Sequence, residues 1–190
     1  MDTIVEKLKC GSVVAVKTDT VYGLVCNAYD KVATAKIYTI KNREVKKPLS
    51  IFVKDIDEVK KYVDESNLND KVLDIMKKYW PGALTIIFKK KGDTFDHITC
   101  GKDSIGIRIP NDDALLHMLN EIDFPLAETS CNISGEKEYR NANEIREKLG
   151  DKIDLIVDGG EVTNNTPSTV ISVENNDIKI LRKGDIVIDE

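Results

Sequence analysis

Short apolar runs rich in β-branched residues alternate with helical patterns along the whole chain, and this alternation limits the fold more than any other feature. In chain order the runs read "SVVAV", "PLSIFV", "LTIIF", "SIGIRI", "PLAET", "DLIVD", "STVISV" and "IKILR". Such alternation is typical of α/β proteins. Because the last runs follow one another without a helix between them, the sheet should not be purely parallel. We therefore expect an α/β fold in which helices flank an open, twisted, mixed sheet of parallel and antiparallel strands.

The clearest helical pattern covers residues 67–79, and the pair Pro81-Gly82 ends it. Apolar residues recur there at the spacing of one helix face, which indicates packing against the core and not a cofactor site. These residues are Leu68, Val72, Ile75, Met76 and Tyr79. Further helices are expected at about residues 30–41, 112–121 and 143–149.

The length and the amino-acid composition favour one domain. With 190 residues and 41% hydrophobic side chains, the chain can bury one sizeable core. No internal repeat, low-complexity tract or proline-rich linker divides it, so residues 1–190 are expected to form a single domain. The N-terminal segment is amphipathic without a signal-peptide pattern, and no apolar run reaches the length of a membrane span. We expect a cytoplasmic protein that does not bind membranes.

Charge and metal-ligand patterns exclude further classes. The formal net charge is -5, with both signs spread along the chain, which argues against a protein whose main work is to neutralise nucleic-acid phosphates. The cysteines and histidines lie in no metal-ligand spacing, and no C-x-x-C pair occurs. They are Cys10, Cys26, Cys100, Cys131, His97 and His117. Free thiols in a reducing compartment are expected, and no metal site made of protein side chains alone.

Common catalytic motifs are missing as well. The chain has no G-x-x-x-x-G-K-[ST] loop and no G-x-G-x-x-G after a strand, so it has neither a P-loop nor a dinucleotide fingerprint. It also has no G-x-S-x-G, and neither histidine has an obvious nucleophile partner. Hydrolysis by a catalytic triad is therefore not expected.

Polar clusters do follow several predicted strands and helices, where loops on a rigid scaffold carry function. Singly, each cluster is typical of a turn, a helix cap or a solvated face. Together they offer cations for a polyphosphate and hydroxyl or amide groups for a small polar ligand. Ser130, Asn132 and Ser134 alternate, so an extended backbone would direct them to one side. The clusters are "KTDTVYGL", "IKNREVKKPLSIF", "WPGALTIIFKK", "ETSCNISGE", "NNTPSTVISV" and "ILRKGDI".

In order and spacing, these clusters resemble the YrdC/TsaC family, the threonylcarbamoyl-AMP synthases, over essentially the whole chain. The matching motifs are "TDTVYGL", K-x-R at Lys41 and Arg43, S-x-N at Ser130 and Asn132, and "WPGALT", "GIRIP", "NISG", "PSTV" and "LRKG". The chain looks like the short, single-domain form of the family. The resemblance therefore implies a YrdC-like fold.

The resemblance also implies an activity, the condensation of L-threonine, bicarbonate and ATP into L-threonylcarbamoyladenylate with release of pyrophosphate. Magnesium would enter with ATP, and no organic cofactor would be needed. The product would pass to a separate tRNA threonylcarbamoyl transferase complex. Binding of tRNA by this chain would be weak at most.

Site residues can be carried over from the same resemblance. The ATP contacts would be Lys41, Arg43, Lys47, Thr85, Asn132, Arg140 and Arg182. The L-threonine contacts would be Thr20, Phe52, Lys89, Ser130 and Ser168. The catalytic set would be Lys41, Arg43, Ser130 and Asn132. Phe52 stands where many relatives carry a histidine, so it could offer threonine only an apolar contact.

Two other interpretations remain open at this point. An RNA-binding module of the same fold would have no adenylate-forming activity, but the acidic net charge and the lack of interleaved aromatic residues weigh against it. A carbamoyl-transfer accessory domain, as found within hydrogenase-maturation proteins, would normally be fused to domains with zinc-finger cysteines, which this sequence lacks.

Overall fold

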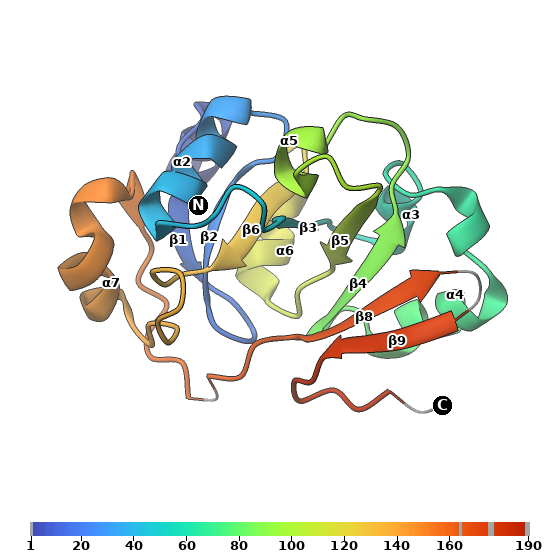
Figure 1. Cartoon of the computed structure of the whole chain (residues 1–190). Helices are drawn as coiled ribbons and strands as arrows, with labels where there is room; N and C mark the ends of the chain where they lie inside the picture. Colours follow the sequence, from blue (N-terminus) through green and yellow to red (C-terminus); the bar gives the residue numbers. More distant parts are fainter. Residues whose placement is uncertain (1, 164, 175–176, 189–190) are drawn as a thin grey trace.

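A mixed β-sheet organises the chain in the computed structural model, which describes residues 2–163, 165–174 and 177–188. Within these ranges the sheet has nine strands in the order β7-β1-β2-β6-β3-β5-β4-β8-β9 (Figure 1). The strands are β1 (Val14–Lys17), β2 (Tyr22–Asn27), β3 (Ser50–Phe52), β4 (Leu84–Lys89), β5 (Ser104–Arg108), β6 (Leu126–Ser130), β7 (Leu155–Ile156), β8 (Thr169–Glu174) and β9 (Asp177–Arg182). Parallel pairs join β1 to β7, β3 to β5 and β4 to β8, whereas the other neighbours are antiparallel. The predicted mixed α/β sheet is confirmed.

The helices begin, in most cases, where a short polar side chain caps the first turn. They are α1 (Asp2–Lys9), α2 (Lys31–Lys41), α3 (Ile56–Val59), α4 (Asp70–Tyr79), α5 (Asp96–Thr99), α6 (Asp113–Asn120) and α7 (Ala142–Leu149), with 3-10 turns at Glu65–Asn67 and Gly150–Lys152. Asp30, Asn69 and Asp112 accept hydrogen bonds from backbone N–H groups of the first turns of α2, α4 and α6. These three helices therefore begin one to three residues later than predicted.

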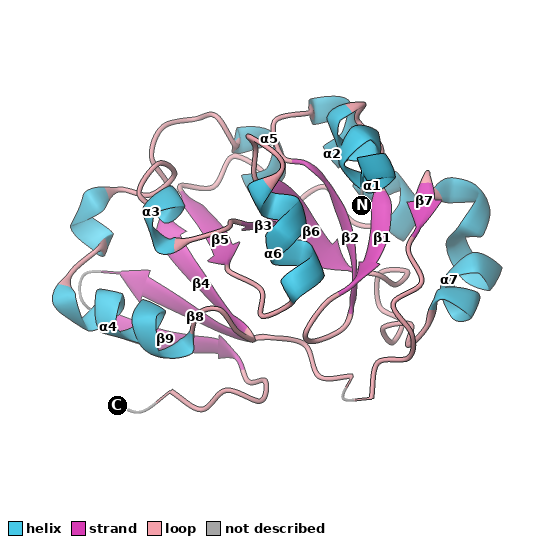
Figure 2. Cartoon of the chain, turned by 180° about the vertical axis from the view of Figure 1, so that it is seen from behind, coloured by secondary structure: helices cyan, strands magenta, loops and turns pink. Residues whose placement is uncertain are grey.

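Helices cover both faces of the sheet. Figure 1 shows α2 in front of β1 and β2, while Figure 2, seen from behind, shows α6 in front of the sheet. Ile37 and Ile40 of α2 belong to one buried apolar cluster, whereas Leu115 and Met118 of α6 belong to a second cluster that also includes Leu8 of α1. The burial of apolar side chains on both faces stabilises the central strands as a rigid platform.

Strand register collects polar side chains on one face of this platform. Glu128 on β6 lies opposite Ser50 on β3, and Ser50 lies opposite Gly106 on β5. Paired residues in a sheet point to the same face. A Cβ atom at Gly106 would lie only 3.1 Å from the Ser50 hydroxyl oxygen, so the glycine keeps this part of the sheet open. The face is therefore polar and shallow where β6, β3 and β5 meet.

Two simpler expectations can be compared with the described residues. The cysteines at positions 10, 26, 100 and 131 are all free thiols, as the sequence predicted. Among the described helices, none combines the length and the apolar character that a membrane crossing requires.

Candidate active site

A cavity of about 330 Å³ lies over the polar face of the central strands. Its volume is within the range of small-molecule sites. The cavity draws on strands β2 to β6, on β8 and β9, and on the loops that precede β2, β3 and β8. Many of the predicted site residues line it together: Thr20, Arg43, Phe52, Thr85, Ser130, Ser168 and Arg182. Thr20, Ser130 and Ser168 thus meet at one cavity from separate segments, and their contact with L-threonine stays a prediction.

The hydroxyl-rich turn after β1 is held by its own side chains. Thr18 Oγ1 donates to the carbonyl of Val21 at 2.7 Å and accepts from the backbone N–H groups of Thr20 and Val21 at 3.1 and 3.2 Å. Thr20 Oγ1 lies 3.0 Å from Thr18 Oγ1. Thr18 therefore shapes the turn, and this shape turns Thr20 toward the cavity.

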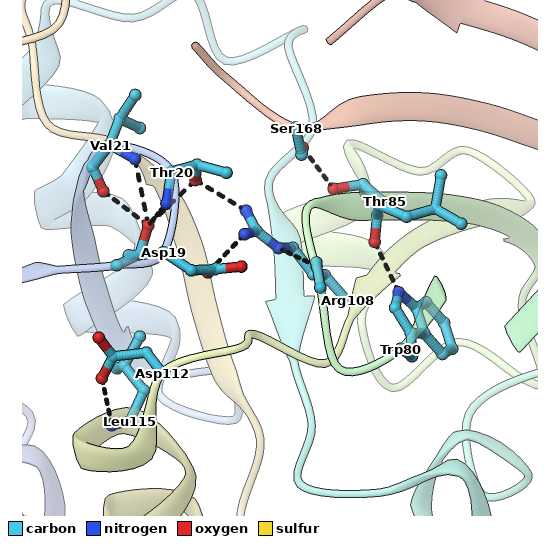
Figure 3. Close-up of polar contacts among 12 residues, drawn as sticks. Asp19, Thr20, Val21, Trp80, Thr85, Arg108, Asp112, Leu115 and Ser168 are labelled. Atoms are coloured by element: carbon cyan, nitrogen blue, oxygen red, sulfur yellow. Dashed lines mark hydrogen bonds and ion pairs between the residues drawn. The ribbon is translucent and has the colours of Figure 1, made fainter. Parts of the chain in front are cut away.

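Arg108, on β5, is the residue that holds this turn against the sheet. Its guanidinium donates to Asp19 Oδ1 at 2.5 Å, to Thr20 Oγ1 at 3.0 Å and to the carbonyl of Gly82 at 2.9 Å (Figure 3). Arg108 is 3% exposed, and its guanidinium carbon lies 5.7 Å from the centre of the Phe52 ring. A guanidinium fixed in this way offers a planar donor group to a carboxylate or phosphate without losing further side-chain entropy.

Sequence reasoning missed Arg108 because the pattern of "SIGIRI" indicates only a strand. The signal was present in the sequence, since an arginine in an apolar central strand must find partners when it is buried.

A second polar group joins three strands at the other side of the cavity. Thr85 Oγ1 on β4 lies 2.8 Å from Ser168 Oγ (Figure 3). Arg182 on β9 donates to the Ser168 carbonyl and to Ser168 Oγ, each at 3.0 Å. The guanidinium of Arg182 is thus held at the cavity wall by the segment that leads into β8.

Lys41 and Asn132 lie behind the cavity and organise Ser130. Lys41 is 1% exposed, and its Nζ donates to the carbonyl and to Oδ1 of Asn132, both at 2.8 Å, and to the carbonyl of Ser130. Ser130 Oγ donates to Asn132 Oδ1 at 2.7 Å. Burial, with a further contribution from Arg43, lowers the pKa of Lys41 to about 8. Neither Lys41 nor Asn132 belongs to the cavity lining, so their expected contact with ATP is not direct in this conformation.

Of the cations in "KNREVKK", Arg43 and not Lys47 reaches the cavity. Arg43 Nη2 donates to the carbonyl of Pro48 at 3.0 Å, and its Nε donates to the carbonyl of Lys47 at 3.2 Å. These bonds close the loop that leads into β3. The ammonium of Lys47 instead forms an exposed ion pair with Glu44 at 3.3 Å.

The structure does not bring Lys89 and Arg140 to this cavity. Lys89 is the last residue of β4, beyond Thr85 and Ile87 of the lining, and its Nζ forms an ion pair with Asp64 at 3.3 Å. Arg140 lines a separate hollow, where its Nε lies 3.8 Å from a carboxylate oxygen of Glu161. Their positions differ from the expectation because both side chains find acidic partners at the surface.

Two other charged side chains line the cavity without having been predicted. Lys102, just before β5, adds a cation, and Glu128 on β6 adds a carboxylate. Burial raises the pKa of Glu128, against the lowering influence of Arg108, a hydrogen bond from Ser50, and the cations Arg182 and Lys41. Lys102 lies outside the polar clusters of the sequence analysis, and Glu128 begins the cluster "ETSCNISGE", of which only the hydroxyl and amide side chains were considered.

Comparison with known proteins decides which family this arrangement belongs to. The Sua5/YciO/YrdC family model, described as "Telomere recombination", matches residues 6–184. The chain belongs to this family. A Methanocaldococcus jannaschii protein, provisionally named a threonylcarbamoyl-AMP synthase, is 39% identical over 99% of this chain and 87% of its own length. The Bacillus subtilis threonylcarbamoyl-AMP synthase is 35% identical over 94% of this chain, which spans only 51% of that protein.

A solved structure of another Sua5/YciO/YrdC protein agrees with the fold. Pyrococcus abyssi Sua5, solved in complex with L-threonine, has a TM-score of 0.90 and 31% sequence identity. The superposition covers 96% of this chain and 53% of the Pyrococcus protein. The YrdC-like fold expected from the sequence motifs is confirmed.

Proposed function

We propose that this chain synthesises L-threonylcarbamoyladenylate from L-threonine, bicarbonate and ATP, with release of pyrophosphate. One observation carries the proposal: the family's hydroxyl residues and three arginines line one cavity, although they come from distant parts of the sequence. The relatives named threonylcarbamoyl-AMP synthases support it, as does the Sua5 structure with L-threonine. The chemistry needs a cavity that positions two substrates and meets their negative charge.

The threonine part of the proposed site is the side near Thr20, Arg108 and Phe52. The guanidinium of Arg108 can receive a carboxylate, while Thr20 and Ser130 offer hydroxyl groups to the substrate. Phe52 can contact only the carbon chain. A carbamate is unstable in water, so the reaction requires the bound substrates to exclude water from this side of the cavity.

The nucleotide part of the proposed site is formed by Arg43, Arg182 and Thr85. When a carbamate oxygen attacks the α-phosphate, negative charge grows on the phosphate oxygens and on the leaving pyrophosphate. Arginines already held by backbone carbonyls can stabilise that charge with little reorganisation. Lys41 and Asn132 are positioning residues in this scheme because they act through Ser130. Lys47, Lys89 and Arg140 are not assigned a contact.

Magnesium carried by the triphosphate of ATP is part of the proposal. The described residues contain no group of three or more His, Cys, Asp or Glu side chains that could hold a metal ion, so the metal would be held mainly by the phosphate oxygens of ATP. The downstream tRNA threonylcarbamoyl transferase complex, a cytoplasmic location and a single-domain chain also remain proposals. The RNA-binding alternative is not favoured, since the relatives are named as synthases.

The proposal is tested by measuring pyrophosphate release from ATP with each substrate omitted in turn. We expect release to require L-threonine and bicarbonate together. Release that continues without L-threonine, or no release with all three substrates present, would contradict the proposed function.

A further inference from the structure

Glu128 is the one carboxylate among the described residues that line the cavity. The other charged lining residues are all cations, namely Arg43, Lys102, Arg108 and Arg182. The proposed substrates have the inverse pattern, because ATP, bicarbonate and the threonine carboxylate are anions and only the threonine ammonium is a cation. Charge complementarity therefore pairs the single acid of the cavity with the single cation among the substrates.

The fold holds Glu128 in a defined place. It lies on β6 two residues before Ser130, so both side chains point to the same face of the sheet. Ser50 lies opposite Glu128 on β3 and forms a side-chain hydrogen bond with it. The charged groups that influence the carboxylate come from three other elements, namely Arg108 of β5, Arg182 of β9 and Lys41 of α2.

We infer that Glu128 binds the ammonium group of the amino-acid substrate and accepts one of its protons before the carbamate forms. The inference rests on the proposed function. Burial supports it independently, because a carboxyl group whose pKa is raised is a better proton acceptor near neutral pH than an ordinary glutamate.

The proton transfer balances with the proposed reaction. Glu128 takes a proton from the ammonium, which leaves a neutral amine with a free electron pair. The amine nitrogen forms a bond to the bicarbonate carbon while the bond from that carbon to the hydroxyl group breaks. The hydroxyl group leaves as water with a second proton from nitrogen, and the carbamate anion remains. Glu128 then returns its proton to solvent through the open side of the cavity.

The variant Glu128→Gln keeps the shape of the side chain and removes its charge. Calorimetry should show L-threonine bound about tenfold or more weakly than by the wild type, with ATP affinity changed less than about twofold. The matched control is Glu138→Gln, because Glu138 also acts electrostatically on Lys41 and Arg182 but does not line the cavity. That control should bind L-threonine normally. Equal loss of L-threonine and ATP affinity in Glu128→Gln, or no loss of either, would overturn the inference.

A second measurement uses only the wild type, so it does not depend on whether a variant folds. The wild type should bind L-threonine much more tightly than (R)-3-hydroxybutanoate, which has the same hydroxyl and carboxylate groups but no amine. Equal affinities would overturn the inference. If the wild type makes threonylcarbamoyladenylate and Glu128→Gln binds L-threonine normally, Glu128 loses its role and the proposed function stands. A wild type that forms no product refutes the proposed function itself.

Discussion

The ammonium nitrogen of Lys41 and Oδ1 of Asn132 lie 2.8 Å apart, in a place almost closed to solvent. This contact joins the last residue of α2 to the segment that follows β6, and the last residue of β6, Ser130, lines the cavity. The residues of the K-x-R and S-x-N motifs are therefore not equivalent. Arg43 and Ser130 reach the cavity, whereas Lys41 and Asn132 hold the backbone behind it.

The first prediction concerns Lys41→Met. Methionine fills similar space but leaves the carbonyls of Ser130 and Asn132 without their donor, so the free energy of unfolding should fall by roughly 2–4 kcal/mol. Chemical denaturation measures the difference. Lys31→Met, an exposed lysine at the start of the same helix, should change stability by less than about 0.5 kcal/mol. Equal stability of the two variants would show that the Lys41 contacts contribute nothing.

The second prediction concerns pH. Because burial lowers the pKa of Lys41 to about 8, the unfolded chain holds a proton at this residue between pH 8 and its ordinary value of 10.5, whereas the folded chain does not. The wild type should therefore gain stability relative to Lys41→Met as pH rises through this range, by up to about 1.4 kcal/mol per pH unit. Urea denaturation of both proteins at the two ends of the range measures this. A stability difference independent of pH would mean that Lys41 keeps an ordinary pKa.

The third prediction concerns Arg43→Lys. Lysine keeps the charge but cannot make the paired hydrogen bonds of a guanidinium. Turnover should fall by roughly two to three orders of magnitude, the equivalent of about 3–4 kcal/mol, if these bonds stabilise the transition state. The melting temperature should hardly change, because the Arg43 side chain is only partly buried in a loop. Lys46→Arg in the same loop serves as control, and near-normal activity in Arg43→Lys would remove Arg43 from the catalytic residues.

The fourth prediction concerns Arg108→Lys. The shorter reach and single charge centre of lysine cannot satisfy Asp19, Thr20 and Gly82 together, so stability should fall by roughly 2–3 kcal/mol. Calorimetry should also show weaker binding of L-threonine, with ATP binding less affected. The exposed Arg146→Lys should leave both measurements unchanged. If Arg108→Lys binds L-threonine with normal affinity, Arg108 does not contact this substrate.

Much of the fold could be predicted from the sequence because its patterns are local. The apolar pattern of α4, and that of each strand, shows which side chains of the element are buried. The caps at Asp30 and Asn69 explain why α2 and α4 begin slightly later than predicted. The strand β2 was not recognised as a separate element. Its residues follow the polar turn closely, and β1 and β2 are distinguished only by the reversal that Thr18 stabilises.

The site was only partly predictable because its geometry depends on strand register. The motifs led us to predict Thr20, Ser130 and Ser168 as site residues, and all three line one cavity. Glu128 and Arg108 could not be placed there without knowing that β6, β3 and β5 are neighbours. Lys89 shows the opposite error, a residue that was predicted but does not line the cavity. Its charge suited the carboxylate of L-threonine, but its side chain forms an ion pair with Asp64.

The fifth prediction concerns RNA. Because the cavity cations are assigned to a triphosphate, tRNA should bind weakly and its affinity should collapse as salt is added. Synthesis of the adenylate should persist at the same salt concentration. A salt titration of tRNA binding, measured beside pyrophosphate release, separates the two functions. Tight tRNA binding that survives moderate salt would favour the RNA-binding module.

The most direct measurement of the proposed synthesis follows labelled carbon into the product. The chain is incubated with ATP, L-threonine and ¹³C-bicarbonate, and the nucleotides are analysed by mass spectrometry. We predict an adenylate that contains threonine and one labelled carbon, formed in step with pyrophosphate and nearly lost in Arg43→Lys. An adenylate without the label, or the formation of ADP and phosphate instead, would contradict the synthesis of threonylcarbamoyladenylate by this chain.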